Sequence, residues 1–276
     1  MMIRLHRLSF ARVLPAILCT LLSAAEFPNQ SPQMNPRNGL ARLDPPVPKF
    51  HLTSAYGEAE VTQGERTRRL EFRDTAAARD ATFRTKAGTE ISLAFSNGAI
   101  IALADESNIH IDDFTQDTSA RQESDVEAEL AASRLQIRLK HGRVAFAASA
   151  GQSSLVSEFG TVRMHGGRVT MEVGLQGMNV SIFSGEALVT VGLNGMGAVV
   201  RAGEQAKLLP GEPMTIGPIP SEGKNRDAKL MALVEQAANA VVFEQTGRGG
   251  DWEFVPHPLT SANPPSSLVI SPDRLQ

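Results

Sequence analysis

Cysteine is almost absent from this chain of 276 residues, which contains only Cys19. That residue lies in an apolar N-terminal segment, and Leu18 stands where a lipoprotein signal has a small residue, so we expect no lipid attachment. If the segment is removed after Ala25, the mature protein has no thiol and no disulfide. The stability of the fold must then come from its apolar core.

Aromatic residues and positive charge are also scarce. Aromatic side chains make up 5% of the chain and hydrophobic side chains 42%, so we expect a core filled mainly by Val, Ile, Leu and Ala. The formal net charge is −3, and loss of Arg4, Arg7 and Arg12 with the N-terminal segment would take it to −6. An acidic chain lacks the positive surface that attracts phosphate backbones, so we expect no nucleic-acid partner.

The apolar run at the N-terminus, residues 13–22, is shorter than the roughly 20 residues that a membrane-spanning helix needs. It follows several basic residues and precedes Ser23-Ala24-Ala25, the small residues that a signal peptidase reads. The sequence therefore predicts a signal peptide that is cleaved between Ala25 and Glu26, and an exported protein, periplasmic or secreted. The alternative is an uncleaved leader that anchors the protein, and we expect membrane contact only in that case.

Proline and glycine divide the rest of the chain into segments. The prolines between residues 26 and 50 leave no room for a helix or a strand ladder, and those after Leu208 indicate a linker. The predicted order is a signal peptide (1–25), a Pro-rich spacer (26–50), a β domain (54–209), a linker (210–224), a helix (225–246) and a flexible tail (247–276).

Short segments of alternating apolar residues, separated by glycine turns, predict antiparallel hairpins. Residues 90–95 alternate with period two, and Ser96-Asn97-Gly98 follows as a strong hairpin signal. The pattern recurs over 134–146, with a turn at His141-Gly142, and over 180–189, with a turn at Ser184-Gly185. We therefore predict an all-β fold, sandwich-like or a short β-solenoid, with one C-terminal amphipathic helix.

Five glycines are predicted to have structural roles in turns. They are Gly98, Gly142, Gly160, Gly185 and Gly203. Each lies beside an apolar strand, where a backbone with positive φ or a bulge favours glycine. A ligand-binding role for these glycines is the alternative.

The predicted helix carries an apolar stripe that must be buried. Its members follow helical spacing: Leu230, Leu233, Val234, Ala237 and Val241. A helix of this length is marginal when isolated in water, so the stripe packs either against the β domain or against a partner. We favour packing against the β domain, because a sheet face is a common docking place for a terminal helix.

Residue types that carry chemistry do not form a recognisable motif. The segment Gly192–Gly197 has the glycines of a dinucleotide fingerprint, but it lies between two predicted strands and opens no helix. No two histidines stand at metal-ligand spacing, and the mature chain offers no cysteine. We therefore predict a non-enzymatic protein with no cofactor, and we assign no catalytic, cofactor-binding or metal-binding residue.

A rival prediction rests on acidic residues. Asp105, Glu106, Asp112 and Asp113 could line a surface groove, and such a groove would suit a small-ligand, cation or glycan-binding protein, or an enzyme. The acidic stretch that continues to Glu129 has no glycine for the sharp bend of a calcium loop. We therefore favour a solvated loop for that stretch.

The β segments resemble the FecR-type domain, the periplasmic module of the iron-dicitrate sensor family. The segments that carry the resemblance are Gly57–Val61, Leu93–Leu103, Leu139–Phe146, Val180–Val189 and Val200–Gln205. They follow the order of the family's strands and turns over about Ser54–Leu208. The sequence departs from the family's pattern at Ser157–Gly160, at Gly166-Gly167 and at Ser184.

The resemblance implies a fold and a setting outside the cytoplasm. It implies a non-enzymatic β scaffold for protein interaction or envelope sensing, with an envelope protein or a second copy as partner. It does not carry over sigma-factor signalling or iron uptake, because the chain shows no counterpart of the segments that serve those roles in the sensor proteins.

Overall fold

The computed structural model of the chain describes residues 47–116, 133–192, 195–248 and 251–258. All of them belong to one compact unit, Leu43–Gln276. The predicted signal peptide, its cleavage site at Ala25 and Glu26, and most of the predicted spacer lie outside the described residues. The last residues of that spacer are not a linker, because Lys49 and Phe50 begin the first strand.

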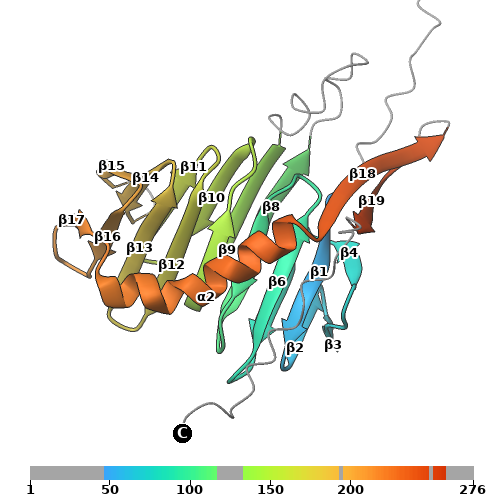
Figure 1. The fold of residues 1–276 in the computed structure, drawn as a ribbon, viewed down its shortest axis with the longest axis horizontal. Coiled ribbons are helices and arrows are strands. Elements are labelled where there is room, and N and C mark those ends of the chain that lie inside the picture. Colours follow the sequence, from blue (N-terminus) through green and yellow to red (C-terminus); the bar gives the residue numbers. More distant parts are fainter. Residues whose placement is uncertain (1–46, 117–132, 193–194, 249–250, 259–276) are drawn as a thin grey trace, which may run out of the picture. The chain divides into compact units, whose positions relative to one another are not determined.

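All described strands except a C-terminal hairpin form two sheets that pack face to face (Figure 1). Sheet A has the order β4 (Thr75–Ala77), β1 (Lys49–Tyr56), β6 (Glu90–Phe95), β7 (Ile100–Leu103), β9 (Ser133–Ala147), β12 (Arg168–Gly174), β13 (Gly177–Ser184), β16 (Glu204–Leu208) and β17 (Thr215–Pro218). Sheet B has the order β3 (Arg66–Arg69), β2 (Ala59–Gln63), β5 (Ala81–Thr85), β8 (Asn108–Gln116), β9, β10 (Gln152–Val156), β11 (Gly160–Met164), β14 (Glu186–Val191) and β15 (Gly197–Arg201).

The long strand β9 is the central strand of both sheets. Its first part pairs with β8 and β10 in sheet B, and its last part, from Gly142, pairs with β7 and β12 in sheet A. The pairing of β9 with β10 is parallel, whereas the other pairings in the two sheets are antiparallel. The prediction of antiparallel hairpins therefore misses one parallel contact at the centre of the fold.

The predicted hairpin turn at His141-Gly142 is wrong, because the chain continues there as one strand. Gly142 has φ of 97°, and this bend carries β9 from sheet B into sheet A. The backbone also passes so close to Ser107 that an added Cβ would overlap it. Glycine is required here for a change of sheet and not for a reversal of direction.

The predicted turn at Ser184-Gly185 is likewise a corner between sheets. β13 lies in sheet A and β14 in sheet B, so the two strands do not form a hairpin. By contrast, the predicted Ser96–Gly98 turn does join paired strands, and the Gly98 amide donates a hydrogen bond to the Phe95 carbonyl at 2.8 Å. Of the five predicted glycines, Gly98, Gly142, Gly185 and Gly203 have positive φ. Gly160 does not; its lack of a side chain makes room for the carbonyl of Thr190.

The main core fills the space between the two sheets. Val, Ile, Leu and Ala are its most frequent members, as predicted, but its largest side chains are five fully buried phenylalanines. These are Phe50, Phe83, Phe95, Phe114 and Phe146. Phe50 and Phe83 meet edge to face across the two sheets, with ring centroids 4.8 Å apart. A low aromatic fraction therefore does not mean a core without aromatic residues.

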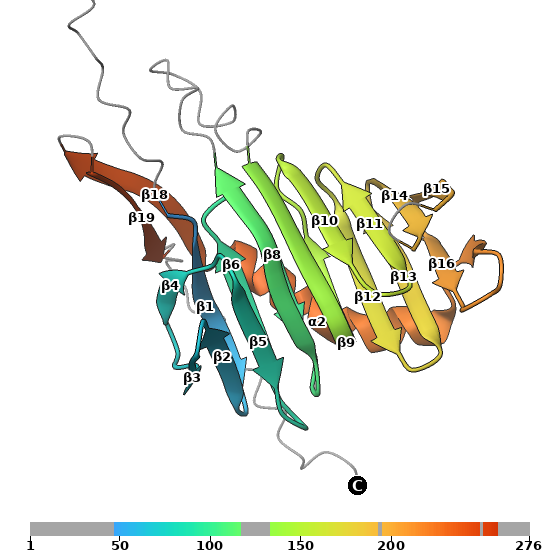
Figure 2. The ribbon, with the colours of Figure 1, turned by 180° about the vertical axis from the view of Figure 1, so that it is seen from behind.

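Helix α2 (Ser221–Ala238) forms a third layer on the outer face of sheet A (Figure 2 shows the opposite side, formed by sheet B). The described residues are therefore all-β with one C-terminal helix, as predicted. The helix begins four residues before the predicted range and ends earlier, because Asn239 caps it and the β-branched residues that follow favour a strand. Val241 thus lies outside the helix.

The predicted tail contains regular structure. β18 (Val241–Arg248) and β19 (Asp251–Pro258) pair as an antiparallel hairpin. The β-branched and aromatic content of Val241–Phe243 suits a strand, and helical spacing alone had placed these residues in the helix. The predicted linker likewise contains β17 and the first turn of α2.

Candidate functional site

The outer face of sheet A has an apolar half and a polar half. The apolar half lies on β6, β7 and the last part of β9, and the C-terminal half of α2 covers it. Its buried residues form a second core: Ala94, Ile100, Ala102, Ala104, Ala145, Leu230, Met231, Val234 and Ala237. The small alanines of the sheet let the helix approach closely, so the larger helix side chains fill the space between the layers.

The polar half of the face lies on β12, β13 and β16. Register aligns Arg143 with Glu172, Glu172 with Asn179, and Asn179 with Lys207, so these four side chains form one row across four strands. Because side chains alternate along a strand, all four project from the same face of the sheet. The row carries charges of both signs, and the helix leaves it partly open.

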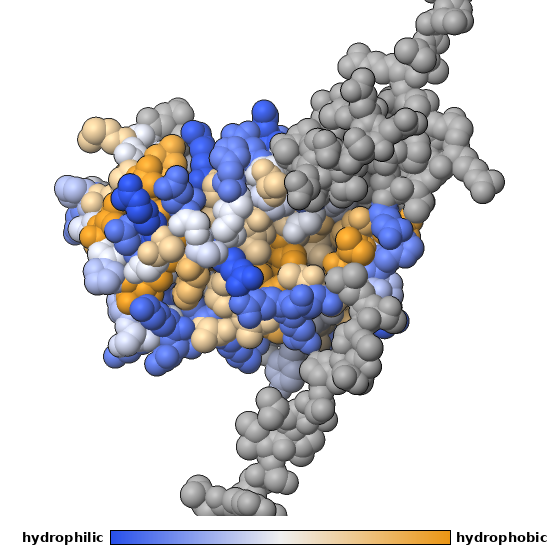
Figure 3. Space-filling model, turned by 45° about the horizontal axis from the view of Figure 1, so that its top comes forward, coloured by the Kyte–Doolittle hydropathy of each residue, from blue (hydrophilic) through white to orange (hydrophobic). Residues whose placement is uncertain are grey.

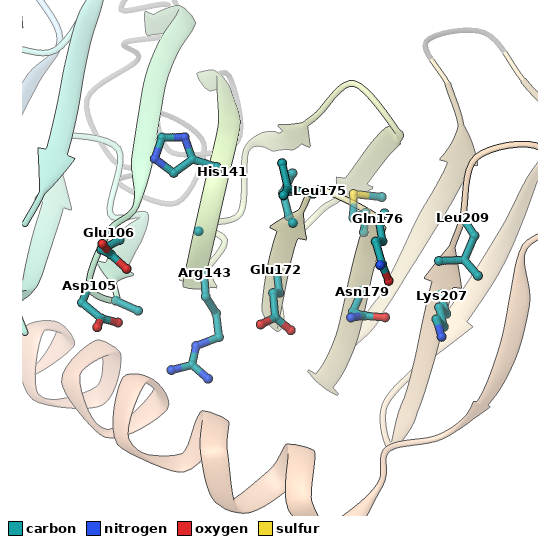
Figure 4. Close-up of a pocket in the computed structure, with 16 residues that line it drawn as sticks. Asp105, Glu106, His141, Arg143, Glu172, Leu175, Gln176, Asn179, Lys207 and Leu209 are labelled. Atoms are coloured by element: carbon teal, nitrogen blue, oxygen red, sulfur yellow. The ribbon is translucent and has the colours of Figure 1, made fainter. Parts of the chain in front are cut away.

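The open part of this row lines a cleft of about 900 Å³, which lies where strands of sheet A end in turns. Asp105 and Glu106 on one side and the turn Gly174–Gly177 on the other complete its walls. Figure 4 shows Arg143 and Glu172 directed from neighbouring strands toward the side on which α2 lies. Leu175, at the tip of the turn, is fully exposed at the rim of the cleft.

A buried carboxylate joins the helix to the polar half of the sheet. Asp227 of α2 is 1% exposed and accepts a hydrogen bond from Thr170 Oγ1 to Oδ2 at 2.6 Å. Its Oδ1 lies 3.7 Å from Arg143 Nη1 and 3.5 Å from Arg226 Nε. Arg226 also pairs with Glu172, with Nη2 and Oε2 2.9 Å apart. The helix is therefore held over the polar half by charges, and two members of this network, Arg143 and Glu172, also line the cleft.

The four acidic residues of the rival prediction do not come together. Asp105 and Glu106 line the cleft, where both are exposed. Asp112 lies on β8 in sheet B and accepts hydrogen bonds from Arg138 Nη2 at 2.6 Å and from Gln136 Nε2 at 3.0 Å. Its carboxylate is thus engaged by its own sheet, and Asp113 lies beside it on the same strand.

Sequence reasoning missed most residues of the cleft. Glu172, Asn179 and Lys207 stand at polar positions of alternating strands, where solvent exposure is the ordinary expectation. The sequence shows only that each of these residues lies near the end of a predicted strand. That they are neighbours on one face becomes clear only when the strand register is known. Of the predicted helix residues, Leu230, Val234 and Ala237 are buried against sheet A and Leu233 is half-buried.

The part of the chain that the structure describes was also compared with the requirements of a metal centre and of a membrane-spanning helix. No three His, Cys, Asp or Glu side chains lie together there in a way that could hold a metal ion. Among the described helices, none is long and apolar enough to cross a membrane.

Residues 81–188 match the protein family described as FecR protein. This part of the chain is similar to the FecR family. The match runs from β5 to β14 and includes every wall of the cleft except Lys207 and Leu209. It supports the resemblance that the strand and turn motifs indicate, whereas the helix α2 lies outside the matched FecR residues.

Two solved structures of a protein described as a "putative anti-sigma factor" from Parabacteroides distasonis ATCC 8503 are similar to this chain. One is 12% identical with a TM-score of 0.41, and the other is 11% identical with a TM-score of 0.40. In both cases the similarity covers 65% of this chain and 85% of the other. No curated protein matches the chain.

Proposed function

We propose that this FecR-domain protein is an exported, non-enzymatic regulator or sensor that binds another envelope protein at the cleft of sheet A. The observation that carries the proposal is the row of Arg143, Glu172, Asn179 and Lys207 beside the fully exposed Leu175. The match to the FecR family supports a regulatory role over an enzymatic one.

The chemistry of the cleft suits a polypeptide partner. Charges of both signs alternate along the row, so a partner segment with the complementary order gains specificity and register. Leu175 supplies an apolar anchor at the rim, and anchors surrounded by polar residues are typical of protein interfaces. The walls come from paired strands, which hold the side chains in place before a partner arrives.

Site-specific photocrosslinking in the native envelope tests this proposal. A photoreactive amino acid at Leu175 should give one discrete adduct with another protein, and Glu172→Lys should abolish it by reversing one charge of the row. Phe72 is the control position, because it is also an exposed large apolar residue but lies next to β3, at the far edge of sheet B. Equal adducts from both positions, or none from Leu175, would contradict the proposal.

The exported location rests on the leader and has its own test. Intact-mass measurement of the protein from the native envelope fraction should show a chain that begins at Glu26. A mass that includes Met1 or Met2 would favour an uncleaved leader that anchors the protein to the membrane.

A second candidate function uses the same cleft for a small polar ligand. The observation in its favour is that Asp105 and Glu106 do line the cleft. A thermal-shift panel of divalent ions and soluble glycans tests it. A rise in melting temperature that Asp105→Asn with Glu106→Gln removes would support ligand binding, and a flat panel would leave the protein-binding proposal in place.

A further inference from the structure

Sheets A and B of the described chain end in four edge strands. These are β4 and β17 in sheet A, and β3 and β15 in sheet B. An edge strand presents unpaired backbone N–H and C=O groups, which can pair with another chain. Soluble proteins therefore protect their edges with charge, proline or very short strands.

Three of the four edges carry such protection. β3 consists of Arg66-Thr67-Arg68-Arg69, and all four residues are exposed. β4 has only three residues. β17 has four residues and ends in Pro218, which has no N–H group to donate to a further strand.

The edge strand β15 has none of these devices over most of its length. Its sequence is Gly197-Ala-Val-Val-Arg201, and Arg201 is its only charge. Val199 is 45% exposed and lies directly opposite Leu188 of β14, which is 39% exposed. Met196, just before the strand, is 91% exposed. In Figure 3, hydrophobic surface gathers at the end of the molecule where β14 and β15 lie.

We propose that β15 is a self-association edge, at which a second copy of this chain adds its own β15 in antiparallel orientation. The pairing centres on Val199 and continues sheet B from one copy into the other across a two-fold axis. The inference rests on the strand edges and on register, and it does not depend on the function proposed for the cleft.

The register that this axis imposes is favourable at every position. Val199 faces Val199 of the second copy, and Arg201 faces Gly197, so the two arginines stand roughly 13 Å apart along the strands. Side chains directly opposite each other on one face of a sheet lie close enough to pack. Leu188 and Val199 of both copies therefore form one apolar strip across the outer face of the joined sheet.

The same operation applied to β3 shows why self-pairing selects β15. A two-fold axis at the centre of β3 would place Arg66 opposite Arg69 and Thr67 opposite Arg68. Like charges directly opposite each other destabilise a strand pair. The contrast between β3 and β15 indicates a second copy of this chain as the partner. Two β15 strands can pair antiparallel without placing like charges opposite each other, whereas two β3 strands cannot.

Sedimentation of the full chain over a concentration series tests the proposal. The wild-type chain should form dimers, and Val199→Lys should raise the dissociation constant by about tenfold or more, since it places two like charges on the axis. Ile216→Lys is the matched control: Ile216 is 41% exposed on the edge strand β17, and its replacement should leave the dimer intact. Melting temperatures of both variants verify that they fold.

A crosslinking experiment tests the proposed register of the β15 pair directly. In a Cys19→Ser background, Val199→Cys should give a covalent dimer with a short bis-maleimide, because only a residue on a two-fold axis meets its own copy at close range. Ile216→Cys should not. A chain that stays monomeric throughout the series, or a dimer that Val199→Lys leaves unchanged, would overturn the proposal and leave β15 to another occupant.

Discussion

Helix α2 covers two halves of sheet A that differ in chemistry. Over β6 and β7 it buries Leu230 and Val234 among alanines. Over β12 it is held by Asp227, which contacts Thr170 and Arg143. The apolar half contributes most of the docking free energy, since burial of a Leu or Val side chain stabilises by roughly 1.5–3 kcal/mol. The polar half determines where the helix lies on the sheet, because a buried carboxylate is stable only beside its hydrogen-bond and ion-pair partners.

The difference between the apolar and polar halves also explains where the cleft lies. Apolar contacts draw the layers together over β6, β7 and the last part of β9, and small alanines permit that approach. Over β12, β13 and β16 the sheet presents longer polar side chains, so its row of charges stays partly open to solvent. A single helix thus closes one half of the face and leaves a binding surface on the other.

The largest effect is expected from a change to the apolar half. Leu230→Asp with Val234→Asp removes two buried apolar side chains and places two charges against sheet A. We expect the free energy of unfolding to fall by about 3–6 kcal/mol, measured by chemical denaturation. Ala232→Asp, at an exposed position of the same helix, should change it little. An unchanged melting temperature would show that the helix does not depend on the sheet and would return it to the role of a partner-binding element.

A smaller loss is expected from the polar half. Asp227→Ala removes the acceptor of the Thr170 hydroxyl and leaves the partly buried Arg143 without its carboxylate. We expect a loss of about 2–3 kcal/mol in the free energy of unfolding. Adding Arg143→Met should recover part of that loss, because the uncompensated charge is then gone. Additive losses in the double variant would mean that the two side chains do not interact.

The bend at Gly142 carries β9 from sheet B into sheet A, and a change there is expected to cost a similar or smaller amount of stability. Gly142→Ala would force a side chain into a backbone with φ of 97° and against Ser107. Strain of this kind costs about 1–3 kcal/mol. Gly166→Ala is the control, because Gly166 has φ of 82° but open space around it. If both variants lose the same stability, the close approach at Ser107 has no energetic weight.

The smallest effect concerns the far end of the helix layer. His51 of β1 lies edge to face with Phe243 of β18, with ring centroids 6.5 Å apart, and its Nδ1 is 2.7 Å from Thr75 Oγ1. Burial lowers the pKa of His51 below its ordinary 6.5, and the charge of Arg73 adds to this. The folded state therefore favours the neutral ring.

The stability that neutral His51 contributes is present above pH 6.5 and is lost as the pH falls through that value toward the lowered pKa of the folded state. Denaturation at about pH 7.5 and about pH 5.5 should show a decrease at the lower pH. His51→Gln should show a smaller decrease, because it removes this titration and leaves the carboxylates in place. Equal decreases in both proteins would exclude a role for His51.

Much of the fold could be predicted because local patterns determine it. Alternation over residues 90–95 and the Asn97-Gly98 turn define a real hairpin, and the stripe containing Leu230 and Val234 defines a real helix face. The corners at Gly142 and Gly185 could not be predicted, because a glycine between two apolar segments serves a reversal and a change of sheet equally well. Only the pairing partners distinguish the two.

The candidate site was less accessible to prediction for a related reason. Asp105 and Glu106 are adjacent in sequence, so the sequence alone could propose them as a site. Glu172 and Lys207 are far apart in sequence and become neighbours of the same row only through β13. Asp227 lies on the predicted helix, but its buried partner Thr170 lies on a distant strand, and helical periodicity cannot reveal that contact.

The position of β9 has a consequence for the order in which the chain can be assembled. Strands β1–β8 lie on one flank of β9 in both sheets, and β10–β17 lie on the other. Because synthesis begins at the N-terminus, eight strands are made before β9, the strand to which both of their sheets attach. Until β9 is made, β7 and β8 lack a neighbour on one side, and β9 then provides the strand to which β10 and β12 pair.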